Sequence, residues 1–181
     1  YEITARGEGF EVRVYPELVI AKTPSGTGEN RAFRRLFDYI SGANEGAREI
    51  SMTAPVLVAG GTEIAMTAPV LGATGWDGSG GEEMAFILPA AFTADTAPIP
   101  TNPEVTLAVI PARRVAVATF SGWADDDDFA DAEAVMRKAL ASAAIETIGP
   151  VETAQYDPPW TLGPFRRNEV LIPVEGGAPK D

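Results

Sequence analysis

A long internal repeat limits the folds open to this chain more than any single motif does. Segment 12–26 contains Pro16 and matches segment 107–122, which contains Pro111 and one additional residue. Each copy precedes a stretch with helical periodicity, and further strand-like segments follow each helix. The repeat predicts a single domain over residues 1–181 that consists of two similar halves, about 1–100 and 101–181.

Most of the sequence outside the two helical stretches has the pattern of short strands. Alternating or β-branched apolar runs predict strands at 10–15, 18–23, 50–58, 63–71, 84–88, 105–110, 114–120, 151–156 and 169–174. These strands occur in runs, whereas a doubly wound parallel sheet needs a crossover helix between nearly every pair. The pattern therefore favours an antiparallel sheet.

Two helices are expected, one in each half. The first, over 31–40, carries an apolar stripe made of Phe33, Leu36, Phe37 and Ile40, and Gly42 follows where a left-handed C-cap residue is usual. The second, over 127–143, follows four consecutive aspartates at 125–128. Carboxylates can bind Ca²⁺ or Mg²⁺, but Asp is also preferred at a helix N-terminus, and we favour capping.

Each half thus reads strand-strand-helix-strand-strand, with one apolar helix face and one apolar sheet face to bury. Two such units bury these faces when their sheets join. We predict an α+β fold, a twisted antiparallel β-barrel flanked by two α-helices, with halves related by a pseudo-twofold axis.

A shorter repeat lies inside the first half. Segment 50–57 recurs as 64–71, and Gly60 and Gly61 lie between the copies. A Gly-Gly pair suits a two-residue turn, so 52–57 and 66–71 are predicted to form a hairpin.

Composition excludes several classes of function. The chain has no His and no Cys, which excludes a Ser-His-Asp triad, a thiolate metal site and a His-ligated heme. A net charge of −12 is unfavourable for nucleic-acid binding, and no apolar run is long enough for a transmembrane segment. The start at Tyr1 rather than Met indicates a removed segment, so both a cytoplasmic and an exported location stay open.

Several motifs together resemble the SOUL/heme-binding protein family. They are FEVRVYP at 10–16, AFRRLFDYISGAN at 32–44, two copies of MTAPV, MAFILP at 84–89, YDPPW at 156–160 and RRNEV at 166–170. The resemblance runs over about 1–174. It implies a distorted β-barrel with two helices and an apolar tetrapyrrole-binding surface beside the first helix, with heme or another tetrapyrrole as the ligand.

The resemblance also implies the site residues. The apolar groove would consist of Phe33, Leu36, Phe37 and Ile40, and the candidate partners of the propionates are Arg34, Arg35 and Arg48. Since the chain has no His, an iron ligand would be Tyr or Met, and Met52 and Met66 are the candidates. For these two, as for Met84 and Met136, core filling is the simpler interpretation.

The function indicated is non-covalent tetrapyrrole binding without a His ligand, and we expect no enzymatic activity. One alternative is a tetrapyrrole-modifying enzyme such as a dechelatase, in which Asp38, Glu45 or Glu49 transfers protons. The other is a non-catalytic subunit that docks on a larger protein complex, whether membrane-associated or not.

Overall fold

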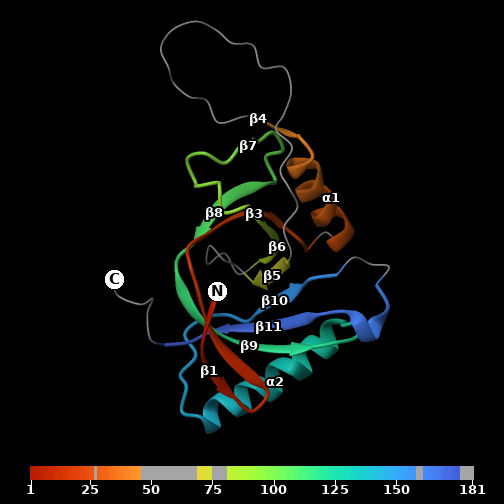
Figure 1. Ribbon diagram of the computed structural model, residues 1–181. Helices are drawn as coiled ribbons and strands as arrows, with labels where there is room; N and C mark the ends of the chain where they lie inside the picture. The colour runs from red at the N-terminus through yellow and green to blue at the C-terminus, as the bar shows by residue number, and fades with distance from the viewer. Residues whose placement is uncertain (27, 46–68, 75–80, 158–160, 176–181) are drawn as a thin grey trace, which may run out of the picture.

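The computed structural model describes residues 1–26, 28–45, 69–74, 81–157 and 161–175 (Figure 1). The predicted strand 50–58, most of the predicted strand 63–71 and the hairpin predicted around Gly60 and Gly61 lie outside the described residues.

The described elements follow the predicted order. They are β1 (Glu2–Gly7), β2 (Phe10–Tyr15), β3 (Leu18–Pro24), α1 (Glu29–Ile40), β4 (Asn44–Glu45), β5 (Val70–Thr74), β6 (Glu82–Ile87), β7 (Ile99–Pro100), β8 (Thr106–Ile110), β9 (Arg113–Phe120), α2 (Asp126–Ser142), β10 (Glu152–Gln155), the 3₁₀ helix η1 (Gly163–Phe165) and β11 (Asn168–Pro173). Both predicted helices are confirmed, and so are the predicted strands that lie wholly in the described part, to within two residues at each end. The sequence did not predict β1, β4, β7 or η1.

Nine strands form one sheet in the order β1-β2-β9-β11-β10-β5-β6-β3-β8, and each neighbouring pair is antiparallel. In the repeat, the strands β2, β3, β5 and β6 of the first half correspond to β8, β9, β10 and β11 of the second. With β1 left aside, the strand order is symmetric under this correspondence, which agrees with the predicted pseudo-twofold axis. The two prolines of the repeat lie between β2 and β3 and between β8 and β9. Tyr15 pairs with Arg113 on one side of the two prolines, and Leu18 pairs with Ile110 on the other side.

The α+β fold with a large antiparallel sheet and two helices is confirmed, but the closed barrel is not. β1 and β8 are the two ends of the strand order, and in the described part of the chain no pairing joins them. The sheet is strongly curved, and α1 and α2 cover its outer side, one on each half (Figure 1).

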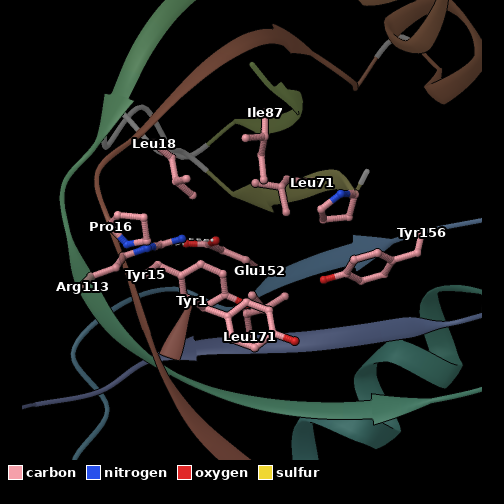
Figure 2. A pocket seen from close by; sticks show the side chains of 11 residues that line it. Tyr1, Tyr15, Pro16, Leu18, Leu71, Ile87, Arg113, Glu152, Tyr156 and Leu171 are labelled. Atoms are coloured by element: carbon pink, nitrogen blue, oxygen red, sulfur yellow. Dashed lines mark hydrogen bonds and ion pairs between the residues drawn. The ribbon is translucent and has the colours of Figure 1, made fainter. Parts of the chain in front are cut away.

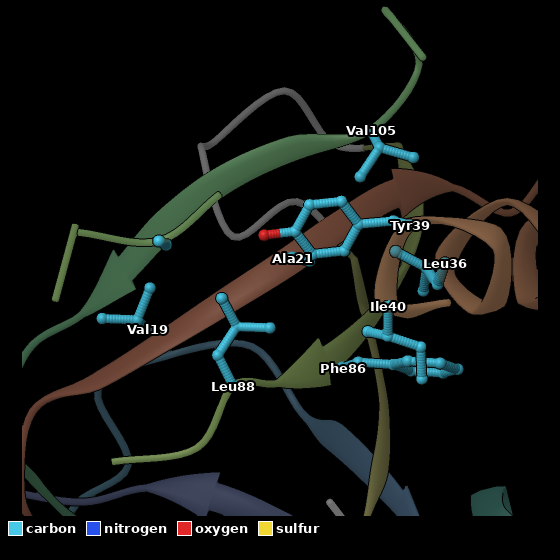
Figure 3. Close-up of a cluster of buried hydrophobic side chains, with 9 residues drawn as sticks. Val19, Ala21, Leu36, Tyr39, Ile40, Phe86, Leu88 and Val105 are labelled. Atoms are coloured by element: carbon cyan, nitrogen blue, oxygen red, sulfur yellow. The ribbon is translucent and has the colours of Figure 1, made fainter. Parts of the chain in front are cut away.

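Alternation along the strands divides the apolar side chains between the outer and inner sides of the sheet. In β3, Val19 and Ala21 face α1 and pack with Leu36, Tyr39 and Phe86 (Figure 3). An equivalent core lies under α2, where side chains of β2, β9 and β11 contact Met136 and Leu140. A third core fills the inner side between the halves, and it contains Ile20, Leu71, Val115, Val117 and Leu171.

The helix ends agree with the sequence. Asp125 Oδ1 accepts from the Asp128 backbone N–H at 3.0 Å, and Asp128 Oδ2 accepts from the Asp125 N–H at 3.2 Å, so the aspartates form a capping box. Gly42, just past α1, has a φ of 114°, a conformation that favours glycine. Within the described ranges, no helix is long and apolar enough to cross a membrane.

Candidate functional site

The predicted apolar stripe of α1 divides into a buried row and an exposed pair. Leu36 and Ile40 are buried in the core under α1, whereas Phe33 and Phe37 remain 38% and 44% exposed. The rings of Phe33 and Phe37 stack with centroids 6.2 Å apart and planes 15° apart, and Phe33 meets Phe86 edge to face at 5.3 Å. Phe33 and Phe37 therefore form a half-exposed aromatic surface along one side of α1, where Phe33 contacts Phe86 of β6.

The basic residues predicted beside this surface have different surroundings. Arg34 is exposed. Arg35 joins α1 to the sheet, because its guanidinium donates to Thr23 Oγ1 at 2.9 Å and to the Pro24 carbonyl, and lies 3.5 Å from Glu104 Oε2. Arg35 is thus engaged in a structural role that the sequence did not reveal. Arg48 lies outside the described residues.

The candidate iron ligands that the structure describes are buried or packed against a core. Met52 and Met66 lie outside the described residues, and Met136 is buried in the core under α2. Tyr39 is buried and donates to the Pro98 carbonyl at 2.8 Å, and burial raises the pKa of its phenol to about 12. Met84 packs against the core under α1.

Two of the three carboxylates considered for proton transfer lie in the described part of the chain. Asp38 and Glu45 are exposed, and Glu49 lies outside the described residues. Among the residues that the structure describes, no group of three or more His, Cys, Asp or Glu side chains is arranged to hold a metal ion.

A cavity of about 220 Å³ lies on the inner side of the sheet, between the two halves (Figure 2). Aromatic and aliphatic side chains and one ion pair line it: Tyr1, Tyr15, Pro16, Leu18, Pro69, Leu71, Ile87, Arg113, Glu152, Tyr156 and Leu171. Leu18, Leu71 and Ile87 come from strands of the first half, and Arg113, Glu152 and Leu171 from strands of the second.

Arg113 and Glu152 form a two-pronged ion pair in the cavity wall. Arg113 Nη2 donates to Glu152 Oε2 at 2.6 Å, and Nη1 donates to Oε1. The Glu152 side chain is 1% exposed. Among the described residues, Arg113 Nε is the only buried side-chain nitrogen or oxygen without a hydrogen-bond partner. A buried donor without an acceptor is rare in folded proteins.

A second polar cluster continues from the cavity wall along the inner side of the sheet. Glu169 is fully buried and accepts from both terminal nitrogens of Arg13 at 2.9 Å. It also accepts from the Tyr156 hydroxyl at 2.6 Å, from Arg167 Nη2 at 2.6 Å and from Thr119 Oγ1 at 3.2 Å. Its charge is therefore well compensated.

These contacts determine the protonation states of the cluster. Burial alone would raise the pKa of Glu169, but the hydrogen bonds from Arg13, Tyr156 and Arg167 outweigh it and hold that pKa below its usual range. Burial and the hydrogen bond to Glu169 both raise the pKa of Tyr156, and burial raises the pKa of Tyr15. At neutral pH, Glu169 is ionised and both tyrosines are neutral.

The sequence did not reveal this inner site, although a signal was present. Arg13, Glu152 and Glu169 occupy strand positions whose neighbours pack under a helix or beside the inner core. A polar residue in an alternating strand usually faces water, and that was the natural interpretation. Here these three side chains are buried on the inner side of the sheet.

Comparison with solved structures supports the fold. The EcmrR C-terminal domain is 13% identical, with a TM-score of 0.63 over 92% of this chain and 96% of that one. A hydrolase from Listeria innocua is 12% identical, with a TM-score of 0.60 over 94% of both chains. SAV2435, bound to tetraphenylphosphonium, is 10% identical, with a TM-score of 0.52 over 93% of this chain and 95% of that one.

The sequence comparisons identify the family. No curated protein matches the chain. The sequence model of the SOUL heme-binding protein family matches residues 1–173, which is nearly the whole chain. The order of the motifs, the two helices on a large antiparallel sheet and this match agree, and the chain belongs to the SOUL heme-binding protein family.

Proposed function

We propose that this protein binds heme or another tetrapyrrole non-covalently on the half-exposed aromatic surface of α1, and that it is not an enzyme. The observation that carries the proposal is the stacked, half-exposed pair Phe33 and Phe37, which offers a flat aromatic surface to a flat ligand. Aromatic rings stack favourably on one another and on extended π-systems. Membership of a heme-binding family supports the same ligand class.

The size of this surface indicates modest affinity. A macrocycle that covers both rings removes roughly 300 Å² of apolar surface from water, or about 7–8 kcal/mol at about 25 cal/mol per Å², before the cost of association. Because association itself costs at least about 4 kcal/mol, we expect the apolar surface alone to give a dissociation constant in the millimolar range, with any tighter binding due to further contacts. Such affinity suits a carrier that releases its ligand.

Arg34 is the partner that we propose for a propionate. It lies three residues before Phe37, so the two side chains are neighbours on the helix surface. Arg35 is a poorer candidate, because Thr23 and Pro24 hold its guanidinium. Phe33, Arg34 and Phe37 thus constitute the described part of the proposed site.

The proposed binding does not depend on a bond to iron. The one Tyr of α1 is buried, and α1 contains no Met, so the helix itself offers no exposed ligand to iron. We therefore expect hemin and metal-free protoporphyrin IX to bind with similar affinity. Bound hemin should not show the spectrum of an imidazole complex, because the chain has no His.

Absorbance titrations of the wild type and two variants test this proposal. Phe37→Ala removes half of the stacked surface and should weaken the binding of both porphyrins at least tenfold. Val135→Ala, on the exposed side of α2, is the control and should bind as the wild type does. Near-UV circular dichroism checks that both variants are folded. Wild-type affinity of folded Phe37→Ala for both porphyrins would place the site elsewhere.

Tetraphenylphosphonium, the ligand of SAV2435, suggests a lipophilic cation as a different ligand class. The inner cavity of this chain is a poor match for a cation. Arg113 pairs with Glu152, and Arg13 and Arg167 pair with Glu169. A bound cation would have to displace one of these arginines or stay beside it, so we do not propose this function.

A further inference from the structure

We infer that the inner cavity is a second ligand site, separate from the α1 surface, and that it takes a small neutral molecule with one or two aromatic rings. A cavity of about 150 Å³ lined by apolar side chains can bind benzene. At about 220 Å³, this cavity has room for two fused rings. It is too small for a tetrapyrrole, since larger ligands occupy pockets of roughly 300 Å³ or more.

Two opposite walls of the cavity suit a flat ring. Leu18 of β3, Leu71 of β5 and Ile87 of β6 form an aliphatic wall. Tyr15 and Leu171 face this wall from the other side of the cavity (Figure 2). An aromatic ligand between the walls would exchange water for aromatic and aliphatic contacts on both of its faces.

The charges in the cavity wall are balanced. Arg113 and Glu152 carry the charged side chains among the lining residues, and they neutralise each other in their two-pronged pair. Arg113 Nε has no acceptor, but it is buried and closed off from a ligand in the cavity. The wall therefore presents no unpaired charge of either sign.

The polar cluster next to the cavity is balanced in the same way. Arg13 contacts both Glu11 and Glu169, and Arg167 contacts Glu169, so two arginines are set against two glutamates. An ion that entered the cavity would lose its hydration without gaining an opposite charge, whereas a neutral ring loses little hydration. The site therefore favours a neutral ligand over both an anion and a cation.

Three ligands of the same ring system test this order in the wild-type protein. Calorimetric titration at pH 7 would use 2-naphthylmethanol, 2-naphthoate and protonated 2-naphthylmethylamine. We expect the alcohol to bind at least tenfold more tightly than either ion. The absence of alcohol binding at millimolar concentration, or an ion that binds as tightly as the alcohol, would overturn the inference.

Two variants connect the binding to this cavity. Leu18→Phe and Ile87→Phe each add a ring to the aliphatic wall, and each should weaken the binding of 2-naphthylmethanol at least tenfold. Val135→Ala is again the control, and near-UV circular dichroism checks that the variants are folded. Wild-type affinity of the folded Phe variants for the alcohol would refute the assignment to this cavity.

A third variant tests the role of charge balance. Glu152→Gln leaves Arg113 without an opposite charge, so the cavity wall gains a net positive charge. The affinity for 2-naphthoate relative to that for the alcohol should then rise at least tenfold. An unchanged ratio in the folded variant would contradict the inferred preference for a neutral ligand. If none of the three variants folds, the order of the three ligands in the wild type decides the question.

The result is independent of the α1 proposal. Leu18 lies on the inner side of β3, whereas Val19 and Ala21 on the opposite side pack under α1. Phe37→Ala should therefore leave the affinity for 2-naphthylmethanol within twofold. Loss of that affinity in folded Phe37→Ala would mean that the naphthyl ring binds on α1 and would overturn the inference, whereas failure of porphyrin binding alone would refute only the α1 proposal.

Discussion

Replacing Glu169 by Gln should destabilise the protein by about 3 kcal/mol. Removing one member of a buried ion pair typically costs about 3–5 kcal/mol, because the remaining charge stays buried without its partner. The Gln side chain also brings an N–H₂ group into a position where Arg13, Tyr156 and Arg167 all donate.

The lower end of that range follows from the partners that remain. Arg13 is buried but keeps Glu11 Oε1 at 2.6 Å and the Tyr15 hydroxyl at 3.1 Å. Arg167 is 44% exposed and can turn toward water. At roughly 2–4 °C per kcal/mol for a domain of this size, the midpoint of thermal unfolding should fall by about 6–12 °C.

Urea unfolding followed by tryptophan fluorescence at pH 7 measures the free energy directly. The matched control is Glu133→Gln, which breaks the partly exposed pair with Arg137 on α2 and should cost only about 0.3–0.5 kcal/mol. A loss below about 1 kcal/mol for Glu169→Gln, with an unchanged denaturant slope, would refute the reasoning.

The same comparison has a defined pH dependence. The pKa of Glu169 is lower in the folded protein than the ordinary value of 4.5. Its ionisation therefore contributes stability that is fully present above about pH 4.5 and is lost as the pH falls through the folded pKa. The difference in stability between wild type and Glu169→Gln should shrink below pH 4.5. A constant difference down to pH 3 would contradict the low pKa.

Two further predictions concern the helices. Asp125→Ala removes the capping box and should cost about 1 kcal/mol in urea unfolding, whereas Asp127→Ala keeps both cap hydrogen bonds and should cost less; equal losses would contradict the capping role. Leu36→Ala creates a cavity in the core under α1 and should cost about 2–5 kcal/mol, whereas Phe37→Ala should cost less because Phe37 is half exposed; the reverse order in thermal unfolding would refute the division of the α1 stripe.

The sequence predicted the elements where a periodic pattern was strong. β2, β3, β9 and β11 each carry apolar residues that must be buried on one side or both, and their bounds were predicted closely. β1 was missed because all six of its residues are exposed, so its sequence has no alternation of buried apolar and exposed polar residues. β4 and β7 have two residues each, too few for any period to appear.

The candidate site was predicted in part for a related reason. Helical periodicity places Phe33, Leu36, Phe37 and Ile40 on one side of α1, but it does not say where the sheet beneath the helix ends. The sheet covers Leu36 and Ile40 and leaves Phe33 and Phe37 at its border. The inner cluster depends on residues far apart in the chain: Arg13 and Glu169 are separated by 156 positions. No local pattern reports such a contact.

The strand order also has a consequence for how the chain assembles. β2 comes first in its own half but pairs with β9 of the other half, and β8 in turn pairs with β3. The first repeated strand of each half therefore pairs with a strand of the other half. Pro16 and Pro111 lie where the chain returns to its own half. This is the reciprocal exchange by which two identical subunits form a swapped dimer. The residues between β6 and β8 thus join in one chain two units that, in a swapped dimer, belong to separate molecules.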